Sequence, residues 1–127
     1  AAVSDWRPKE KAKTKIKKTF GDKPPIVELV ENPDILKNIC NSQNRPDLVI
    51  GFAAETDNLL SNARLKLEKK GCDWIIANRV NSENLNMGGD ENEVTIIKKN
   101  EEIKLKRQTK EKIAELICET IVEDIST

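Results

Sequence analysis

The stretch Leu48-Val-Ile-Gly-Phe-Ala-Ala-Glu-Thr56 decides how the rest of the chain is interpreted. Its first three residues form the apolar run of a short buried strand, and a helical pattern begins near Asn58. We therefore predict a strand-to-helix turn over residues 51–56. A ligand can approach the main chain closely where side chains are small, at Gly51, Ala53 and Ala54. In open parallel sheets ligands bind beyond the carboxyl ends of the strands. The alternative is that this hexapeptide only ends a buried strand.

The residues after this stretch predict a β-α-β unit. A helical stripe runs through Leu60, Ala63 and Leu67, and Gly71 is a suitable C-terminal cap. A second strand follows at residues 73–77. Such a unit implies two parallel strands joined by a right-handed crossover, which places the chain in the α/β class.

The flanking segments add further elements. Residues 1–3 are typical of the last part of a buried strand, residues 4–8 of the turn that leaves it, and residues 26–30 of a short strand. The run Asn32-Pro-Asp34 predicts a helix start that reaches about residue 41. Near the C-terminus, residues 93–97 and 103–105 predict a β-hairpin, followed by a packing helix from about Thr109.

Composition limits the classes of function. The chain has 127 residues, which suits one domain. It contains no His, which excludes catalysis by histidine and metal binding through histidine. Its 22 basic residues equal its 22 acidic ones, so no overall field attracts nucleic acid. Cys40, Cys72 and Cys118 lack metal or redox spacing and are interpreted as buried or idle thiols of a reducing cytoplasm. No apolar run approaches the roughly 20 residues of a membrane span, so we expect a cytoplasmic protein with no membrane or nucleic-acid partner.

Two groups of lysines are candidates for binding phosphate. Six lysines occur within residues 9–18, and such a run is either a solvated loop or a flap that closes over phosphates. Lys66 and Lys70 are four residues apart and share one helix face. They either offset the helix dipole or face an anion at the preceding turn.

Four stretches in order resemble one family, the DNA/pantothenate metabolism flavoproteins, whose C-terminal domain is phosphopantothenate–cysteine ligase. They are Ala1-Ala-Val-Ser-Asp-Trp-Arg-Pro8 followed by Lys15-Ile-Lys-Lys18; Asn32-Pro-Asp-Ile-Leu36; Gly51-Phe-Ala-Ala-Glu-Thr56 with Ala63, Lys66, Leu67, Lys70, Asp73, Ala77 and Asn78; and Met87-Gly-Gly-Asp-Glu-Asn-Glu-Val94. Each stretch is unspecific alone, but the combination covers nearly the whole chain.

The resemblance implies a Rossmann-like, mostly parallel sheet with flanking helices and a C-terminal hairpin and helix, in a dimeric protein. It implies CTP and Mg²⁺ or Mn²⁺ as requirements. The family activates 4′-phosphopantothenate as an acyl-cytidylate, and L-cysteine then displaces CMP. A carboxylate and a triphosphate repel each other, so cations must offset their charges.

Site residues carried over from the family fall into two groups. Lys66 would be the catalytic lysine, and the remaining nucleotide site would comprise Gly51, Phe52, Ala53, Ala54, Lys70, Asn78, Met87, Asp90 and Lys110. The phosphopantothenate site would comprise Asp5, Lys15, Lys17 and Lys18. Asp90 would help hold the metal or the ribose, and Met87 replaces a Phe that many relatives place against the base.

The family also has an earlier half of the ligase domain and a flavin-containing decarboxylase domain before it. We therefore expect residues 1–127 to be the C-terminal part of a ligase domain, with those segments lying outside this sequence. The alternatives are a non-catalytic nucleotide-binding module and a dimerisation fragment that uses the hairpin near residues 93–106. Binding of CTP without release of pyrophosphate would favour the first alternative.

Overall fold

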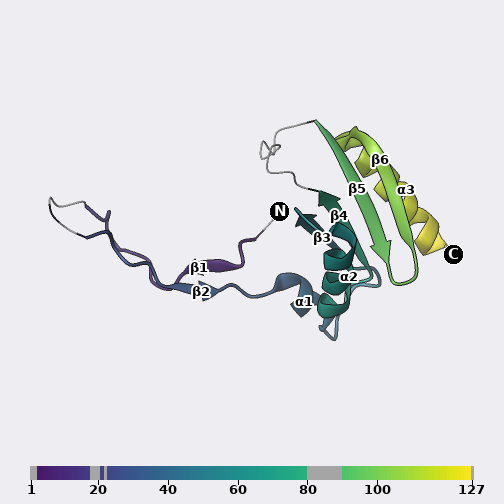
Figure 1. Ribbon diagram of the computed structural model, residues 1–127. Helices are drawn as coiled ribbons and strands as arrows, with labels where there is room; N and C mark the ends of the chain where they lie inside the picture. Colours follow the sequence, from purple (N-terminus) through teal and green to yellow (C-terminus); the bar gives the residue numbers. More distant parts are fainter. Residues whose placement is uncertain (1–2, 18–20, 22, 80–89, 127) are drawn as a thin grey trace. The chain divides into compact units, whose positions relative to one another are not determined.

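The computed structural model describes residues 3–17, 21, 23–79 and 90–126 (Figure 1). The chain divides into two units, residues 1–35 and 36–127, which are described separately. The first unit contains β1 (Trp6–Pro8) and β2 (Leu29–Glu31), and helix α1 (Ile35–Cys40) begins at its last residue. The second unit contains, in order, β3 (Ile50–Glu55), α2 (Leu59–Lys70), β4 (Trp74–Arg79), β5 (Glu91–Lys98), β6 (Glu102–Thr109) and α3 (Lys110–Ser126).

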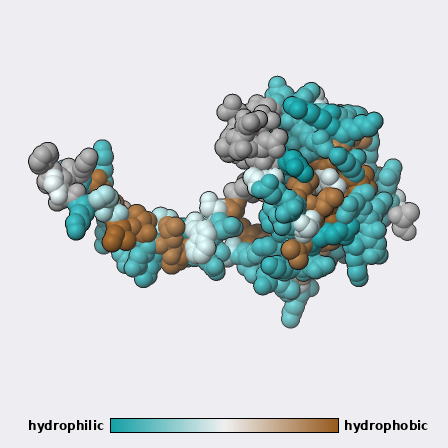
Figure 2. Space-filling model, viewed as in Figure 1, coloured by the Kyte–Doolittle hydropathy of each residue, from teal (hydrophilic) through white to brown (hydrophobic). Residues whose placement is uncertain are grey.

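The first unit is an antiparallel strand pair without a buried core among its described residues. Trp6 pairs with Glu31, and Asn32 Nδ2 donates to Ser4 O at 2.6 Å. All its described residues are exposed or half-buried, and Figure 2 shows hydrophobic side chains at its surface. A two-stranded ribbon of this kind is marginally stable alone.

Several predictions for the first unit need correction. The predicted turn over residues 4–8 is wrong in its second half, because Trp6–Pro8 form β1. The predicted strand over residues 26–30 is shifted, because pairing with β1 begins only at Leu29. Val3 is not in a strand, and residues 1–2 of the predicted strand end lie outside the described residues. The predicted helix after Asn32-Pro-Asp34 is confirmed as α1.

The second unit is a small α/β domain built on one mixed sheet with the strand order β3-β4-β5-β6. The predicted β-α-β unit is confirmed, since β3 and β4 are parallel and α2 connects them. The expectation of a mostly parallel sheet is wrong for the described strands. The predicted hairpin exists as β5 and β6, but it joins the same sheet because β5 pairs antiparallel with β4.

Helices α2 and α3 cover opposite faces of this sheet (Figure 1). Side chains alternate between the faces of a strand, so neighbouring residues of β4 enter different cores. Ile75 and Ala77 pack with Ala63 and Leu67 of α2. Trp74 and Ile76 pack in a second core, with Ile113 of α3. The sheet is therefore the middle of three layers.

The sequence patterns locate both long helices. Gly71 caps α2 with φ +74°, where its N–H donates to Leu67 O at 3.0 Å. The predicted apolar stripe is shifted by one residue at its start, because Leu59 packs on the core and Leu60 is exposed. The predicted face of α3 is confirmed by the buried Ile113 and by Ile117 and Ile121, which pack on the same core.

The predicted turn over residues 51–56 is wrong, because the chain remains in β3 through Glu55. The direction changes only at residues 56–58, where Asn58 takes a left-handed conformation with φ 48°. Close packing explains the small residues. A Cβ on Gly51 would lie 2.6 Å from Leu36 Cδ2 and 2.8 Å from Ile75 Cδ1. Gly51 is thus needed for a close approach of side chains from the protein itself.

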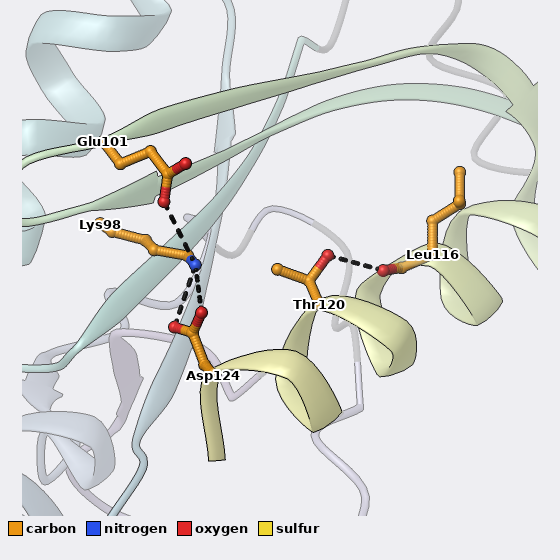
Figure 3. A network of polar contacts seen from close by, with 5 residues as sticks. All are labelled: Lys98, Glu101, Leu116, Thr120 and Asp124. Atoms are coloured by element: carbon orange, nitrogen blue, oxygen red, sulfur yellow. Dashed lines mark hydrogen bonds and ion pairs between the residues drawn. The ribbon is translucent and has the colours of Figure 1, made fainter. Parts of the chain in front are cut away.

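A polar network joins the end of α3 to the hairpin (Figure 3). Lys98 Nζ lies 2.8 and 2.9 Å from the two carboxylate oxygens of Asp124 and 3.3 Å from Glu101 Oε2. The same amine lies 4.5 Å from the ring centre of Trp74. Within α3, Thr120 Oγ1 donates to Leu116 O at 2.8 Å. The network holds the last turn of α3 against the amino end of β4.

Candidate functional site

Along β3, the main-chain groups of alternate residues point either to the neighbouring strand β4 or to an open edge. Asp73 N donates to Val49 O at 2.9 Å, so the main chain of residue 49 faces β4. Main-chain groups alternate in direction along a strand, so Gly51 and Ala53 also face β4. Phe52 and Ala54 face the other way, and among the described strands β3 has no neighbour on that side. Of the main-chain contacts predicted at Gly51, Ala53 and Ala54, that of Ala54 faces this open edge and those of Gly51 and Ala53 are directed to β4. The main chain of Phe52 faces the open edge as well.

Phe52 adds an apolar side chain to this open edge. It lies on the face of the sheet opposite α2, and 74% of it is exposed. An aromatic side chain that is this exposed in the middle of a strand is a candidate contact for a ring or for another polypeptide segment.

Lys66 is held at the carboxyl end of β3 by Glu55. Its Nζ lies 2.6 Å from Glu55 Oε1, and the side chain of Glu55 is 14% exposed. Asn62 Nδ2 donates to Glu55 Oε2 at 3.2 Å and to Asp57 O at 3.0 Å. One turn of α2 and the end of β3 thus form a single polar cluster of Glu55, Asn62 and Lys66.

The predicted residues Asn78, Asp90 and Lys110 lie at the same end of the sheet. Asn78 is half-buried near the end of β4 and pairs with Ala54. Because β5 runs antiparallel to β4, the start of β5 and the end of β6 lie at the carboxyl end of β4. Asp90 and Lys110 are both exposed there, and Lys110 N donates to Asp90 O at 2.8 Å. The fold therefore gathers these groups with Lys66 at one edge.

The metal prediction has limited support from side chains. Asp90 is an exposed carboxylate, and in the described part of the chain no three acidic or thiol side chains form a metal-binding group. Mg²⁺ is commonly held by one or two carboxylates together with substrate phosphates. Asp90 fits that arrangement as a single protein ligand.

Of the other predicted site residues that the structure describes, only Lys70 belongs to the same unit as β3. Lys70 ends α2, is half-buried and takes part in an interaction of its own. Asp5, Lys15 and Lys17 are exposed in the first unit. Lys18 and Met87 lie outside the described residues.

A cavity of about 530 Å³ lies at the other end of the sheet, away from Lys66, Asn78, Asp90 and Lys110. Its lining includes Gly71, which follows Lys70, so Lys70 belongs to this end of α2. The lining also includes Trp74 and Lys98, the paired residues at the start of β4 and the end of β5. Burial lowers the pKa of Lys98, but the hydrogen bonds that its amine donates to Asp124 and Glu101 outweigh this and leave its pKa raised. The amine stays charged but is already neutralised by two carboxylates, so it is a poor phosphate ligand.

The cysteines differ in exposure: Cys72 is buried, Cys40 half-buried and Cys118 exposed. Burial, with a smaller effect of neighbouring Cys40, raises the pKa of the Cys72 thiol to about 11. Because thiolates are the reactive form, Cys72 is a packing residue.

We expect iodoacetamide at pH 8 to alkylate Cys118 first and Cys72 last in the folded protein, as read by peptide mass spectrometry. Between pH 9 and 11 the unfolded chain loses the Cys72 proton while the folded chain retains it. This thiol therefore lowers the free energy of unfolding as the pH rises through that window. All three cysteines should react equally in denaturant, and early labelling of Cys72 without denaturant would contradict its burial.

Two polar contacts of this unit are not among the sequence predictions. Glu55 has no predicted role, although an acidic residue that ends a strand before a lysine-bearing helix is a usable signal. Asp73 also anchors the start of β4: its Oδ2 accepts from Arg45 Nη2 at 2.6 Å and from Val49 N at 2.7 Å. No local pattern indicates the pairing of Arg45 with Asp73.

The described residues contain no helix long and apolar enough to cross a lipid bilayer.

Comparison with known proteins gives a consistent result. Residues 1–125 match the family model for the DNA/pantothenate metabolism flavoprotein C-terminal domain. The coenzyme A biosynthesis bifunctional protein CoaBC of Vibrio parahaemolyticus is 34% identical over 123 residues, which cover 97% of this chain and 31% of that protein. The protein of the same name from Haemophilus influenzae is 38% identical, with coverage of 97% and 30%.

A crystal structure of the C-terminal domain of a CoaBC protein is similar in fold as well as sequence. Its TM-score is 0.69 at 31% identity, and the match covers 99% of this chain and 52% of that one. The chain thus spans about a third of the length of the curated relatives and about half of the solved domain.

Proposed function

Because this chain belongs to the DNA/pantothenate metabolism flavoprotein C-terminal domain family, we propose that it is part of a phosphopantothenate–cysteine ligase that uses CTP. The names of its relatives place them in coenzyme A biosynthesis. The chain covers about a third of the length of those proteins.

The proposed reaction has two steps. The carboxylate of 4′-phosphopantothenate attacks the α-phosphorus of CTP, which forms an acyl-cytidylate and releases pyrophosphate. The amine of L-cysteine then attacks the acyl carbon, and CMP leaves as the amide forms. Both steps concentrate negative charge on phosphate oxygens, so a preorganised cation lowers the barrier.

One observation supports this proposal most: the Lys66 amine pairs with Glu55 at the carboxyl end of β3, the strand whose Phe52 and Ala54 direct their main-chain groups to the open edge. An edge of this kind offers donors and acceptors to a base, and an amine at the end of the same strand offers charge to the phosphates. Asn78, Asp90 and Lys110 lie at the same end of the sheet. We assign them to the nucleotide and its Mg²⁺ or Mn²⁺.

The remaining assignments concern phosphopantothenate and assembly. The lysine-rich segment with Lys15 and Lys17 carries exposed charges suited to the phosphate of 4′-phosphopantothenate, and Asp5 is assigned to the same substrate. We also propose a homodimer, because the first unit exposes large hydrophobic side chains that a second subunit can cover.

Titration calorimetry tests the nucleotide assignment. We expect CTP with Mg²⁺ to bind more tightly than Mg²⁺ with ATP, and pyrophosphate to be released only with 4′-phosphopantothenate present. Replacing Asn78 by Ala should weaken CTP binding, whereas Asn100→Ala in the hairpin turn at the other end of the sheet is the matched control. Binding of CTP without any release of pyrophosphate would favour the non-catalytic module. Equal heats for both variants would contradict this site.

A further inference from the structure

The polar cluster of Glu55, Asn62 and Lys66 contains a carboxylate that the proposed reaction does not use. Glu55 is 14% exposed, and burial of a charged carboxylate is costly unless a partner compensates it. Lys66 is that partner, at 2.6 Å from Oε1. The buried Oε1 makes no hydrogen bond with another described group, so its contact with the amine is an ion pair of poor hydrogen-bond direction.

Glu55 itself is well fixed. It is the last residue of β3, whose main chain pairs with β4 at Arg79. Its second oxygen accepts from Asn62, and Asn62 also donates to Asp57 O in the turn that follows. The carboxylate is therefore anchored to both the strand and the helix, while the lysine side chain remains 44% exposed and can move.

We propose that Glu55 is a positioning residue, which holds the Lys66 amine at the carboxyl end of β3 and is the anion that an incoming triphosphate displaces. The identity of the triphosphate rests on the proposed function. The restraint of the Lys66 amine by Glu55 is independent of the proposed function. An amine paired in advance binds an anion less tightly, because the new contact replaces an old one. The same pairing keeps the amine near the position where it acts.

The first test measures the restraint directly, without nucleotide. Brief acetylation of the folded chain, read by peptide mass spectrometry, gives the labelling rate of Lys66 relative to exposed Lys69 on the same helix. We expect Glu55→Gln to raise this ratio about two- to fivefold, the range that corresponds to a partly exposed ion pair. Glu55→Asp keeps the charge and should leave the ratio nearer to that of the original chain.

A matched control removes another ion pair of the same helix. Arg64 Nε donates to Glu102 Oε1 at 2.9 Å, so Glu102→Gln loosens α2 without touching Glu55. The labelling ratio should not change in this variant. An unchanged ratio in Glu55→Gln, or an equal rise in Glu102→Gln, would overturn the inference.

The second test separates positioning from a structural defect. In CTP-dependent turnover, Glu55→Gln should lower the KM for CTP and kcat together, and Glu55→Asp should restore both in part. Partial unfolding would lower kcat and leave KM unchanged, and that pattern would overturn the inference. If the labelling ratio rises in Glu55→Gln but no variant binds CTP, the proposed function fails while the restraint of Lys66 by Glu55 is supported.

Discussion

Replacing Lys66 by Gln should reduce kcat/KM for CTP-dependent pyrophosphate release by about 10²- to 10³-fold, the loss typical of removing one preorganised group that stabilises transition-state charge. The physical reason is that glutamine keeps a polar side chain, one atom shorter than that of lysine, but removes its positive charge. The measurement is pyrophosphate release by a protein that contains this chain and turns over CTP. Lys69→Gln is the matched control, because Lys69 is exposed on the same helix.

This variant also leaves Glu55 buried without its counter-ion, which should lower the free energy of unfolding by about 1–3 kcal/mol. The double variant Glu55→Gln with Lys66→Gln separates the two effects. It should recover most of the lost stability but none of the lost activity. Recovery of activity in the double variant would show that Lys66 acts only by neutralising Glu55, and it would remove the catalytic role assigned to this lysine.

Replacing Ile96 by Ala should lower the free energy of unfolding by about 2–5 kcal/mol, as is typical for truncation of a fully buried isoleucine. Ile96 is 0% exposed and lies in register between Ile76 of β4 and Ile103 of β6. Truncation of Ile96 leaves a cavity in the core beneath α3. The strands around it are held by β-sheet hydrogen bonds and cannot move in to fill this cavity. Urea denaturation followed by circular dichroism measures the change as a lower midpoint with an unchanged slope.

Val122→Ala is the control for this experiment, because Val122 lies on α3 but is 63% exposed. Its effect should stay within about 0.5 kcal/mol. Equal losses for the two variants would mean that the sheet face beneath α3 is not a packed core.

The β-α-β unit, the hairpin and the last helix were predictable from the sequence because their signals are local. Apolar runs, the periodicity of Ile113, Ile117 and Ile121, and a glycine at the end of α2 each involve residues within a few turns of one another. The order of the strands in the sheet depends on contacts between distant segments. For that reason the sequence did not reveal that the hairpin extends the same sheet and makes it mixed.

The candidate site divides in the same way. The resemblance selected Lys66, which lies on the predicted helix, and the stretch around Gly51, which lies in β3 and not in the predicted turn. The small residues of that stretch suggested an exposed turn, but Gly51 and Ala53 are small because Leu36, Ile75 and α2 pack against them. The direction of each main-chain group is set by pairing with β4. Only that pairing assigns Phe52 and Ala54, and not their neighbours, to the open edge.

The sequence by itself determined the family, the elements of the β-α-β unit and the lysine at its helix, since these depend on residue type and short spacing. Tertiary structure alone decided that Glu55 forms an ion pair with Lys66 and that the main chain of Lys110 donates to that of Asp90. It also decided that Asn78 lies at the same end of the sheet. The reason is physical: charge pairing and strand pairing depend on positions in space. Residues separated by 11 or 20 positions along the chain become neighbours only after the sheet has formed.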